Sequence, residues 1–189
     1  AQIHALLANK PEEKILAFRC HWCSYGGADL AGTSHFEYSA NERGIRVMCS
    51  ARMDTDFIYE AFRLGAGAVL YSGCHPQDCH YITGQRVGAA RAERLLKIFE
   101  KMGMTPGRFR VEWISAAEGD KYARVINEMQ KVISSIPKEQ LLKEIETLRP
   151  QMEQRARRMY EIPQVSEAIA YSEQLTAILT AKEVAGGRT

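Results

Sequence analysis

The sequence predicts an α/β fold, in which a small, open, mostly parallel four-stranded sheet is flanked by helices and followed by an all-helical C-terminal extension. Three observations predict this fold. Short, apolar, β-rich runs alternate with helical patterns through the first two-thirds of the chain, which is typical of βα units around a parallel sheet. Glycines and prolines separate the runs. Beyond Ser134 only helical patterns occur, so we expect an α/β domain at 12–134 and a helical extension at 135–189.

Four strand-helix units are expected in order along the chain. The strands are expected at 14–19, 45–48, 68–71 and 109–114, and the helices that follow them at 25–35, 54–64, 86–101 and 117–132. Gly65 and Gly103 are placed to end the second and third of these helices, and Asp54 is placed to cap the start of the second. The four residues from Ser115 to Glu118 have the spacing of a capping box, which would open the last helix and account for Glu118.

The extension has the pattern of short amphipathic helices. Two apolar stripes recur at helical spacing, one of Leu141, Leu142, Ile145 and Leu148 and the other of Ile169, Leu175, Ile178 and Leu179. Pro150 and Pro163 are expected to divide the extension. Because short helices are only marginally stable in isolation, we expect two or three of them to dock on the body or on a partner protein.

Composition and charge exclude several classes of protein. The chain has 189 residues, of which 46% are hydrophobic and 25% charged, as expected for one well-packed domain with an appendage. The formal net charge of +2 gives no strong field, so neither nucleic acid nor an acidic membrane is an expected partner. No long apolar run or signal peptide is visible, and we expect a cytoplasmic protein.

The five cysteines fall at informative positions. An odd number of cysteines in a chain expected in the cytoplasm argues against a disulfide scaffold and favours metal binding or redox chemistry. Cys20, Cys49 and Cys74 each follow one of the first three expected strands, so their thiols are expected at the carboxyl edge of the sheet, where neighbouring strands lie about 4.8 Å apart. Cys23 and Cys79 complete a C-x2-C and a C-x4-C pair. The sequence therefore predicts that these thiols converge on one small metal site.

The thiols leave three functions open, namely an iron-sulfur protein, a thiol-disulfide oxidoreductase and a zinc-stabilised adaptor. Four thiolates hold a structural zinc ion, a 2Fe-2S cluster or a 4Fe-4S cluster, but the consecutive C-x2-C-x2-C-x3-C run of bacterial 4Fe-4S ferredoxins is absent. The two spacings favour a 2Fe-2S cluster, with one of the five cysteines left over. A thiol-disulfide oxidoreductase that uses Cys20 and Cys23 is one alternative, and a zinc-stabilised assembly adaptor is the other.

Residues beside the cysteines are expected to support the site. His21, His75 and His80 flank cysteines and could ligate zinc or a Rieske-type iron, but hydrogen bonding or surface packing is their expected role. Trp22 and Tyr81 are expected to pack there and keep water from the metal. No nucleotide-binding or hydrolase motif accompanies the cysteines, and a metal site without a substrate site favours an electron carrier.

The cysteines also belong to longer motifs. These are CHWCSYGGADLAGT at 20–33, RVMCS at 46–50, GCHPQDCHY at 73–81 and EWISA at 112–116. Together they closely resemble the delta (iron-sulfur) subunit of the methyl-viologen-reducing hydrogenase, and the resemblance covers 14–132. The cysteines of the family motifs match all five cysteines of this chain.

This resemblance implies a cofactor and partners. Members of the family carry a 2Fe-2S cluster and relay electrons to the flavin-containing subunit of heterodisulfide reductase, in cytoplasmic electron-bifurcating complexes of methanogens and related bacteria. The donor would be a hydrogenase, a formate dehydrogenase or another oxidoreductase, and the family member itself would perform no bond chemistry. Cys74 and Cys79 are the cysteines most expected to ligate, and Cys49 the first to be left out.

Overall fold

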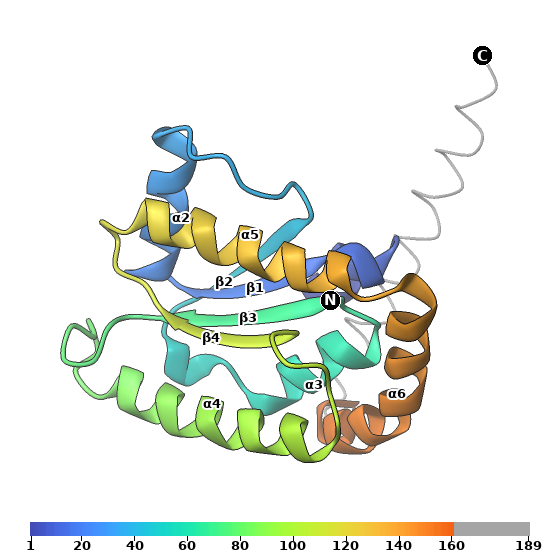
Figure 1. The fold of residues 1–189 in the computed structure, drawn as a ribbon. Coiled ribbons are helices and arrows are strands. Elements are labelled where there is room, and N and C mark those ends of the chain that lie inside the picture. The colour runs from blue at the N-terminus through green and yellow to red at the C-terminus, as the bar shows by residue number, and fades with distance from the viewer. Residues whose placement is uncertain (161–189) are drawn as a thin grey trace.

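The computed structural model of the protein describes residues 1–160, and its centre is a four-stranded parallel sheet. The strands are β1 (Ile15–Cys20), β2 (Glu42–Val47), β3 (Ala68–Gly73) and β4 (Phe109–Trp113). They lie in the order β2-β1-β3-β4, and every neighbouring pair is parallel (Figure 1). The predicted α/β fold with an open parallel sheet is therefore confirmed.

Helices cover both faces of the sheet. On one face lie α2 (Ser24–Thr33) and α5 (Gly119–Ser135), and on the other lie α3 (Thr55–Arg63) and α4 (Gly84–Lys101) (Figure 1). Alternate side chains of β1 enter the two cores, because successive residues of a strand point to opposite faces. Leu16 and Phe18 join the core under α3 and α4, whereas Ile15 and Ala17 join the core under α2 and α5.

Three short elements complete the α/β part. They are α1 (Gln2–Leu7) and two 3-10 turns, η1 (Pro11–Glu13) and η2 (Ser50–Arg52). No sequence pattern predicted α1, whose Ile3 and Leu7 are buried in the core on the α3 side. Among residues 1–160, no helix combines the length and the apolar composition that a membrane crossing requires.

The helix ends follow the expected residues in two helices and depart from them in α5. Gly65 and Gly103 adopt φ angles of 93° and 74°, the left-handed conformation that glycine takes readily after a helix. Asp54 caps α3 by accepting a hydrogen bond from the Asp56 amide at 3.2 Å. Helix α5, in contrast, begins at Gly119, and Glu118 accepts a hydrogen bond from the Ser115 amide at 2.7 Å without capping the helix.

The expected break at Pro150 is wrong, because a single helix, α6 (Lys138–Tyr160), continues through this residue. Proline removes one hydrogen bond of a helix and tends to kink it, and α6 changes direction along its length (Figure 1). The part after Pro150 is held by packing, since Met152 and Ala156 are fully buried in the core that includes α3. Pro163 and the stripe formed by Ile169, Leu175, Ile178 and Leu179 lie outside the described residues.

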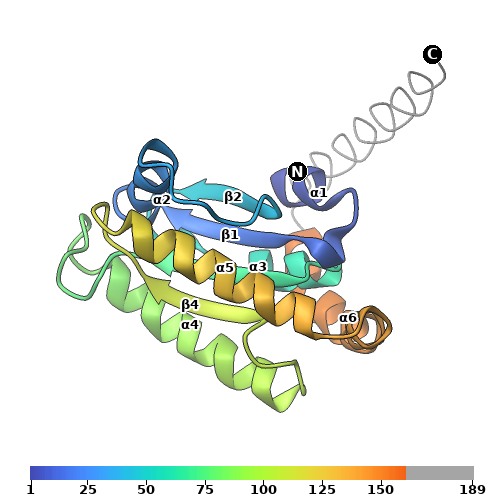
Figure 2. The same ribbon diagram turned by 45° about the horizontal axis from the view of Figure 1, so that its top comes forward.

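Helix α6 closes the end of the molecule where the strands begin (Figure 1 and Figure 2). Leu141 and Ile145 enter the core on the α5 side, and Leu148 enters the core on the α3 side, whereas Leu142 remains 39% exposed. The helix therefore joins both layers of the fold.

A buried ion pair fixes α6 to this end of the sheet. Arg108, which is 1% exposed, donates to the carbonyl oxygens of Ala66 and Gly67 at 2.9 and 2.8 Å. Its remaining partner is Glu144 of α6, whose Oε1 lies 2.7 Å from Nη1 of Arg108 and also accepts from the Thr105 amide at 2.9 Å. The buried charge is thus paired and hydrogen-bonded, which a stable buried guanidinium requires.

Candidate metal centre

All five cysteines lie at the carboxyl edge of the sheet. Cys20 is the last residue of β1, and Cys74 directly follows the neighbouring strand β3. Cys49 lies two residues beyond β2, on the other side of β1. Cys23 is the N-cap residue of α2, and Cys79 lies in the loop between β3 and α4. The five side chains pack into one cluster, although they come from three separate segments of the chain.

Three of the thiols are close enough to share one metal ion. The Sγ atoms of Cys20 and Cys74 are 3.6 Å apart, and those of Cys20, Cys23 and Cys74 all lie within 4.8 Å of one another. Two thiolates on one tetrahedral metal, with metal-sulfur bonds of about 2.3 Å, would lie about 3.8 Å apart. The Cys20-Cys74 pair already has nearly this separation.

The other two thiols meet at the start of α4. A Cβ atom built on Gly84, the first residue of α4, would lie 2.3 Å from Sγ of Cys49 and 3.2 Å from Sγ of Cys79. A side chain at this position would force these sulfurs or the start of the helix to shift, so glycine permits their close approach. Burial raises the pKa of the Cys49 thiol, and the neighbouring Cys79 raises it further. Gly84 was not singled out from the sequence, although a glycine five residues after a candidate ligand is a signal for a close approach of the backbone.

The protonation states of Cys20 and Cys74, which we call the central pair, depend on each other. The hydrogen bond from Cys74 is the main reason that the pKa of Cys20 falls to about 5, against the effect of burial. The same hydrogen bond raises the pKa of Cys74, because Cys74 keeps its proton while Cys20 loses one. Burial also raises the pKa of Cys23. The pair thus holds a thiolate beside a protonated thiol, and a bound cation would replace the remaining protons, since only thiolates ligate metals.

The start of α2 stabilises the thiolate of Cys20. The Ser24 amide donates to Sγ of Cys20 at 3.4 Å, and the Ser24 hydroxyl donates to the same sulfur at 3.5 Å. Amides at the start of a helix are free to donate, and the helix dipole favours negative charge there. Ser24 is fully buried, so these donors are shielded from water.

The histidines beside the cysteines hydrogen-bond or stack. Nε2 of His75 lies 2.6 Å from Oε2 of Glu118, and the ring of His80 stacks on Trp22 with centroids 4.0 Å apart. The hydrogen bond from the Ser115 amide is the main cause that lowers the pKa of Glu118 to about 2, and His75 contributes to this shift. The capping box therefore does not fully account for Glu118, because its carboxylate also holds the side chain that follows Cys74.

Trp22 and Tyr81 lie near the thiols and are only partly buried, so their expected shielding of the metal stays a prediction. Their side chains are 44% and 43% exposed, and Nε1 of Trp22 donates to the Tyr81 hydroxyl at 3.3 Å. Tyr81 lines a shallow hollow of about 500 Å³ together with Cys49 and Gly84. The thiol cluster therefore lies next to an open, partly aromatic surface.

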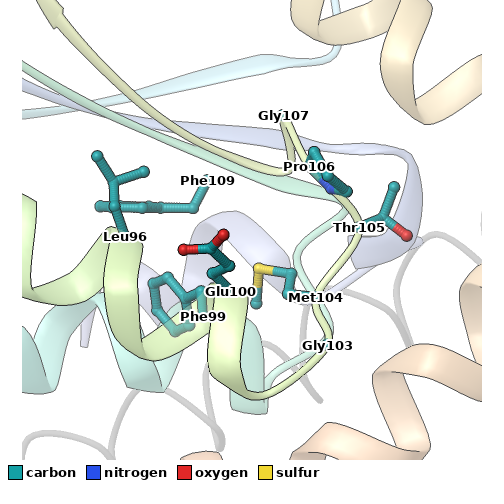
Figure 3. Close-up of a pocket in the computed structure, with 9 residues that line it drawn as sticks. All are labelled: Leu96, Phe99, Glu100, Gly103, Met104, Thr105, Pro106, Gly107 and Phe109. Carbon is teal, nitrogen blue, oxygen red and sulfur yellow. The ribbon is translucent and has the colours of Figure 1, made fainter.

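A second hollow, of about 520 Å³, lies at the opposite end of the sheet, between α4 and the turn that leads into β4 (Figure 3). Its lining residues are Leu96, Phe99, Glu100, Gly103, Met104, Thr105, Pro106, Gly107 and Phe109. These nine residues include neither a cysteine nor a histidine, and Glu100 is the charged residue among them. This hollow has none of the chemistry of the thiol cluster.

The fold and the thiol cluster define an α/β protein with a candidate thiolate metal centre at the carboxyl edge of its sheet. The chain belongs to the family of the methyl-viologen-reducing hydrogenase delta subunit, whose family model matches residues 15–136. The resemblance seen in the sequence motifs is therefore confirmed.

Relatives contain this domain in two contexts. The chain is 42% identical over 130 residues to the vhc iron-sulfur subunit of the F420-non-reducing hydrogenase of Methanococcus voltae, a match that covers 69% of this chain and 90% of the relative. It is 43% identical over 137 residues to one subunit of the ferredoxin/F420H2-dependent CoB-CoM heterodisulfide reductase of Methanosarcina acetivorans. This second match covers 72% of the chain but 17% of the relative. The domain thus forms nearly all of one protein and a small part of the other.

Proposed function

We propose that the protein is an electron-transfer subunit that carries a 2Fe-2S cluster and performs no bond chemistry itself. It would relay electrons between a hydrogenase, a formate dehydrogenase or another oxidoreductase and the flavin subunit of heterodisulfide reductase, in an electron-bifurcating complex. The convergence of five thiols at one edge of the sheet carries this proposal, above all the 3.6 Å separation of the Cys20 and Cys74 sulfurs. Soft thiolate ligands in this number are typical of iron-sulfur sites.

Four of the five cysteines would hold the cluster. Cys20, Cys23 and Cys74 form one group, and Cys49 and Cys79 lie together beside Gly84. The cluster, when bound, supplies one-electron transfer. The chain supplies the thiolates, the amide and hydroxyl donors of the α2 start, and a position at the surface. Replacing each cysteine singly by serine would identify the one that is spare.

The two contexts of the domain support the proposed partners. One relative is named as a hydrogenase iron-sulfur subunit, and another is a heterodisulfide reductase subunit that includes this domain in a much longer chain. In one relative the domain is nearly the whole protein, and in the other it is covalently attached to the rest of a reductase subunit. We expect the domain to contact such a reductase subunit in both systems. A relay between a hydrogenase-type donor and the reductase agrees with both relatives.

A zinc-stabilised assembly adaptor is the second candidate function. The observation that favours it is the group of Cys20, Cys23 and Cys74, because three thiols within 4.8 Å of one another also suit a single tetrahedral ion. A thiol-disulfide oxidoreductase has less support. The pKa of Cys20 is low, but its side chain is 1% exposed, and a catalytic thiolate must reach its substrate.

The metal content of the full chain tests the proposal. After anaerobic purification we expect about two iron and two acid-labile sulfide per chain, and a reduced protein with a rhombic electron paramagnetic resonance (EPR) signal. One zinc per chain without iron would contradict the electron-relay function and favour the adaptor. The Cys74→Ser variant, shown to be folded by circular dichroism, serves as the control for specific loading.

We also propose that the extension at 135–189 contributes to docking, as an addition to the α/β domain at 12–134. Its first part packs on the protein's own core through Leu141, Ile145 and Leu148, so the partner role falls to residues beyond α6. A chain that ends at residue 160 is expected to keep its metal and to bind the partner more weakly. Unchanged binding would contradict this role.

A further inference from the structure

Exposed apolar side chains gather around the thiol cluster. Of the eight large hydrophobic side chains that are exposed within residues 1–157, five lie at this edge. These five are Trp22, Met48, Tyr81, Ile82 and Val87. Apolar residues that are exposed singly are normal, but a contiguous group of them marks a binding surface.

Four of these side chains are linked to one another, and together with Ile82 they make up what we call the thiol-edge surface. Trp22 is hydrogen-bonded to Tyr81, and Tyr81 lines the hollow beside Cys49 together with Met48 and Val87. Ile82 follows Tyr81 directly, and its amide donates to the carbonyl of Cys79 at 2.8 Å. This surface therefore covers the positions through which electrons would leave or enter a cluster.

Ile82 is held in an unfavourable backbone conformation beside Tyr81 in this surface. Its φ angle is 62°, and a hydrogen bond of 2.6 Å from the Thr83 amide to the Tyr81 carbonyl closes a three-residue turn around it. Positive φ is costly for a β-branched residue, and a three-residue turn of this hand is strained. Glycine would adopt the same turn without this cost.

Among the side chains described, those of residues 1–157, none buries Ile82 and so compensates for its backbone strain. The side chain is 83% exposed, more than any other large apolar side chain in the described part of the chain. A strained, exposed and apolar residue beside a functional cluster is explained when a partner buries it.

We propose that Ile82 is the anchor of the surface that docks the flavin subunit of heterodisulfide reductase, and this inference rests on the proposed function. The partner would present an apolar socket to Ile82 and its neighbours and an acidic side chain to Arg52, the charged residue that lines the hollow. The reductase is the chosen occupant because one relative carries this domain and the rest of a heterodisulfide reductase subunit in a single chain. The electron-accepting group of the partner would then lie opposite the thiols.

Two substitutions at Ile82 separate docking from folding. Ile82→Gly removes the side chain and relieves the backbone strain, and Ile82→Asn keeps a side chain that tolerates positive φ. The matched control is Leu96→Asn, which removes an exposed apolar side chain of α4 at the other end of the sheet. Each full-length variant, loaded with its metal, is mixed with the purified flavin subunit of heterodisulfide reductase from the same organism, and the dissociation constant is measured by calorimetry.

We expect both Ile82 variants to weaken the complex at least tenfold, whereas Leu96→Asn leaves the affinity unchanged. The Ile82→Gly variant should also melt at a higher temperature than the wild type, because the backbone strain is relieved. Removal of a side chain that only stabilised the fold would lower the melting temperature instead. Its EPR spectrum should be unchanged. Equal affinity of all variants, or a wild-type protein that does not bind the flavin subunit, would overturn the docking proposal.

A second copy of this chain is the competing occupant. If the wild type is a dimer that Ile82→Gly dissociates, the surface is a self-association site and the docking proposal is wrong. None of these outcomes depends on the kind of metal bound, because metal content and the EPR signal are measured on the unmixed protein. Failure of the docking proposal is therefore distinguishable from failure of the proposed metal centre.

Discussion

The two ends of the sheet satisfy their polar groups in different ways. At the amino end, the guanidinium of Arg108 finds its partners inside the chain, in Glu144 and two backbone carbonyls. At the carboxyl end, five thiols lie together with few donors between them, and Ile82 is strained and exposed. At the amino end the buried charge of Arg108 is satisfied by the chain itself, and this arrangement stabilises the fold. We propose that the second end takes a cation for its thiols and a partner for its surface, as is typical of a functional site.

The largest effect is expected from removing one thiol of the central pair. Cys74→Ser should abolish iron loading, because a hydroxyl is a poor ligand for a soft metal and the sulfur that lies 3.6 Å from Cys20 is lost. Iron and sulfide analysis of the purified variant measures this loss. A Cys74→Ser protein that retains its full iron content would show that the cluster, if present, does not use this pair.

A substitution that breaks the ion pair at the amino end should lower the free energy of unfolding and leave the metal content unchanged. Glu144→Gln leaves the buried Arg108 without its counter-charge, so we expect a loss of about 3–5 kcal/mol in the free energy of unfolding. Urea denaturation followed by circular dichroism measures it. The matched control is Glu128→Gln, which removes an exposed ion pair with Arg110 and should cost about 0–1 kcal/mol. Similar costs for both variants would contradict the anchoring role of the buried pair.

Gly84→Ala should disturb the carboxyl end more gently. The new Cβ would lie 2.3 Å from the sulfur of Cys49, so the thiols or the start of α4 must shift, at a cost of about 1–3 kcal/mol. We expect lower iron occupancy and an altered EPR spectrum. Gly32→Ala in α2 is the control, because no atom outside its own stretch of helix lies within 4 Å of the new Cβ, and it should stabilise the protein by about 0.5–1 kcal/mol. An unchanged spectrum in Gly84→Ala would mean that this close approach has no role in the site.

The smallest expected effect is on the pH dependence of the free energy of unfolding, through the carboxyl group of Glu144 at the amino end. Burial alone would raise the pKa of Glu144, but hydrogen bonds from Thr105 and Arg108 outweigh it and lower the pKa. A carboxyl with a lowered pKa contributes stability above its unfolded value, about 4.3, and loses that contribution as the pH falls through its folded value. The free energy of unfolding should therefore fall more steeply below about pH 4 in the wild type than in Glu144→Gln. Parallel curves for the two proteins would contradict this assignment.

Much of the fold could be predicted because its signals are local. Strand and helix patterns alternate along the chain, and Asp54, Gly65 and Gly103 mark helix ends through their own conformational preferences. Helix α1 was missed because a six-residue helix has little periodicity and is held by the burial of Ile3 and Leu7. The expected break at Pro150 was wrong because packing after the proline, which the sequence does not display, holds the helix together.

The site was predictable in part for the same reason. The cysteines follow strands, and the ends of neighbouring parallel strands meet, so local patterns sufficed to place the thiols of Cys20, Cys49 and Cys74 at one edge. The hydrogen bond between His75 and Glu118 joins residues that are 43 positions apart, and no local pattern reveals it. The positive φ of Ile82 was equally hidden, because a β-branched residue gives no signal for a left-handed turn.

We propose above all that the thiols at the carboxyl end hold a one-electron centre. A potentiometric titration of the anaerobic full-length protein, followed by EPR spectroscopy, tests it most directly. We expect a single transition with a slope of about 59 mV per tenfold change in the ratio of oxidised to reduced protein, and a signal that appears on reduction. A slope of about 30 mV without a signal would indicate a dithiol, and the absence of any transition would indicate zinc. Either result would contradict the relay function.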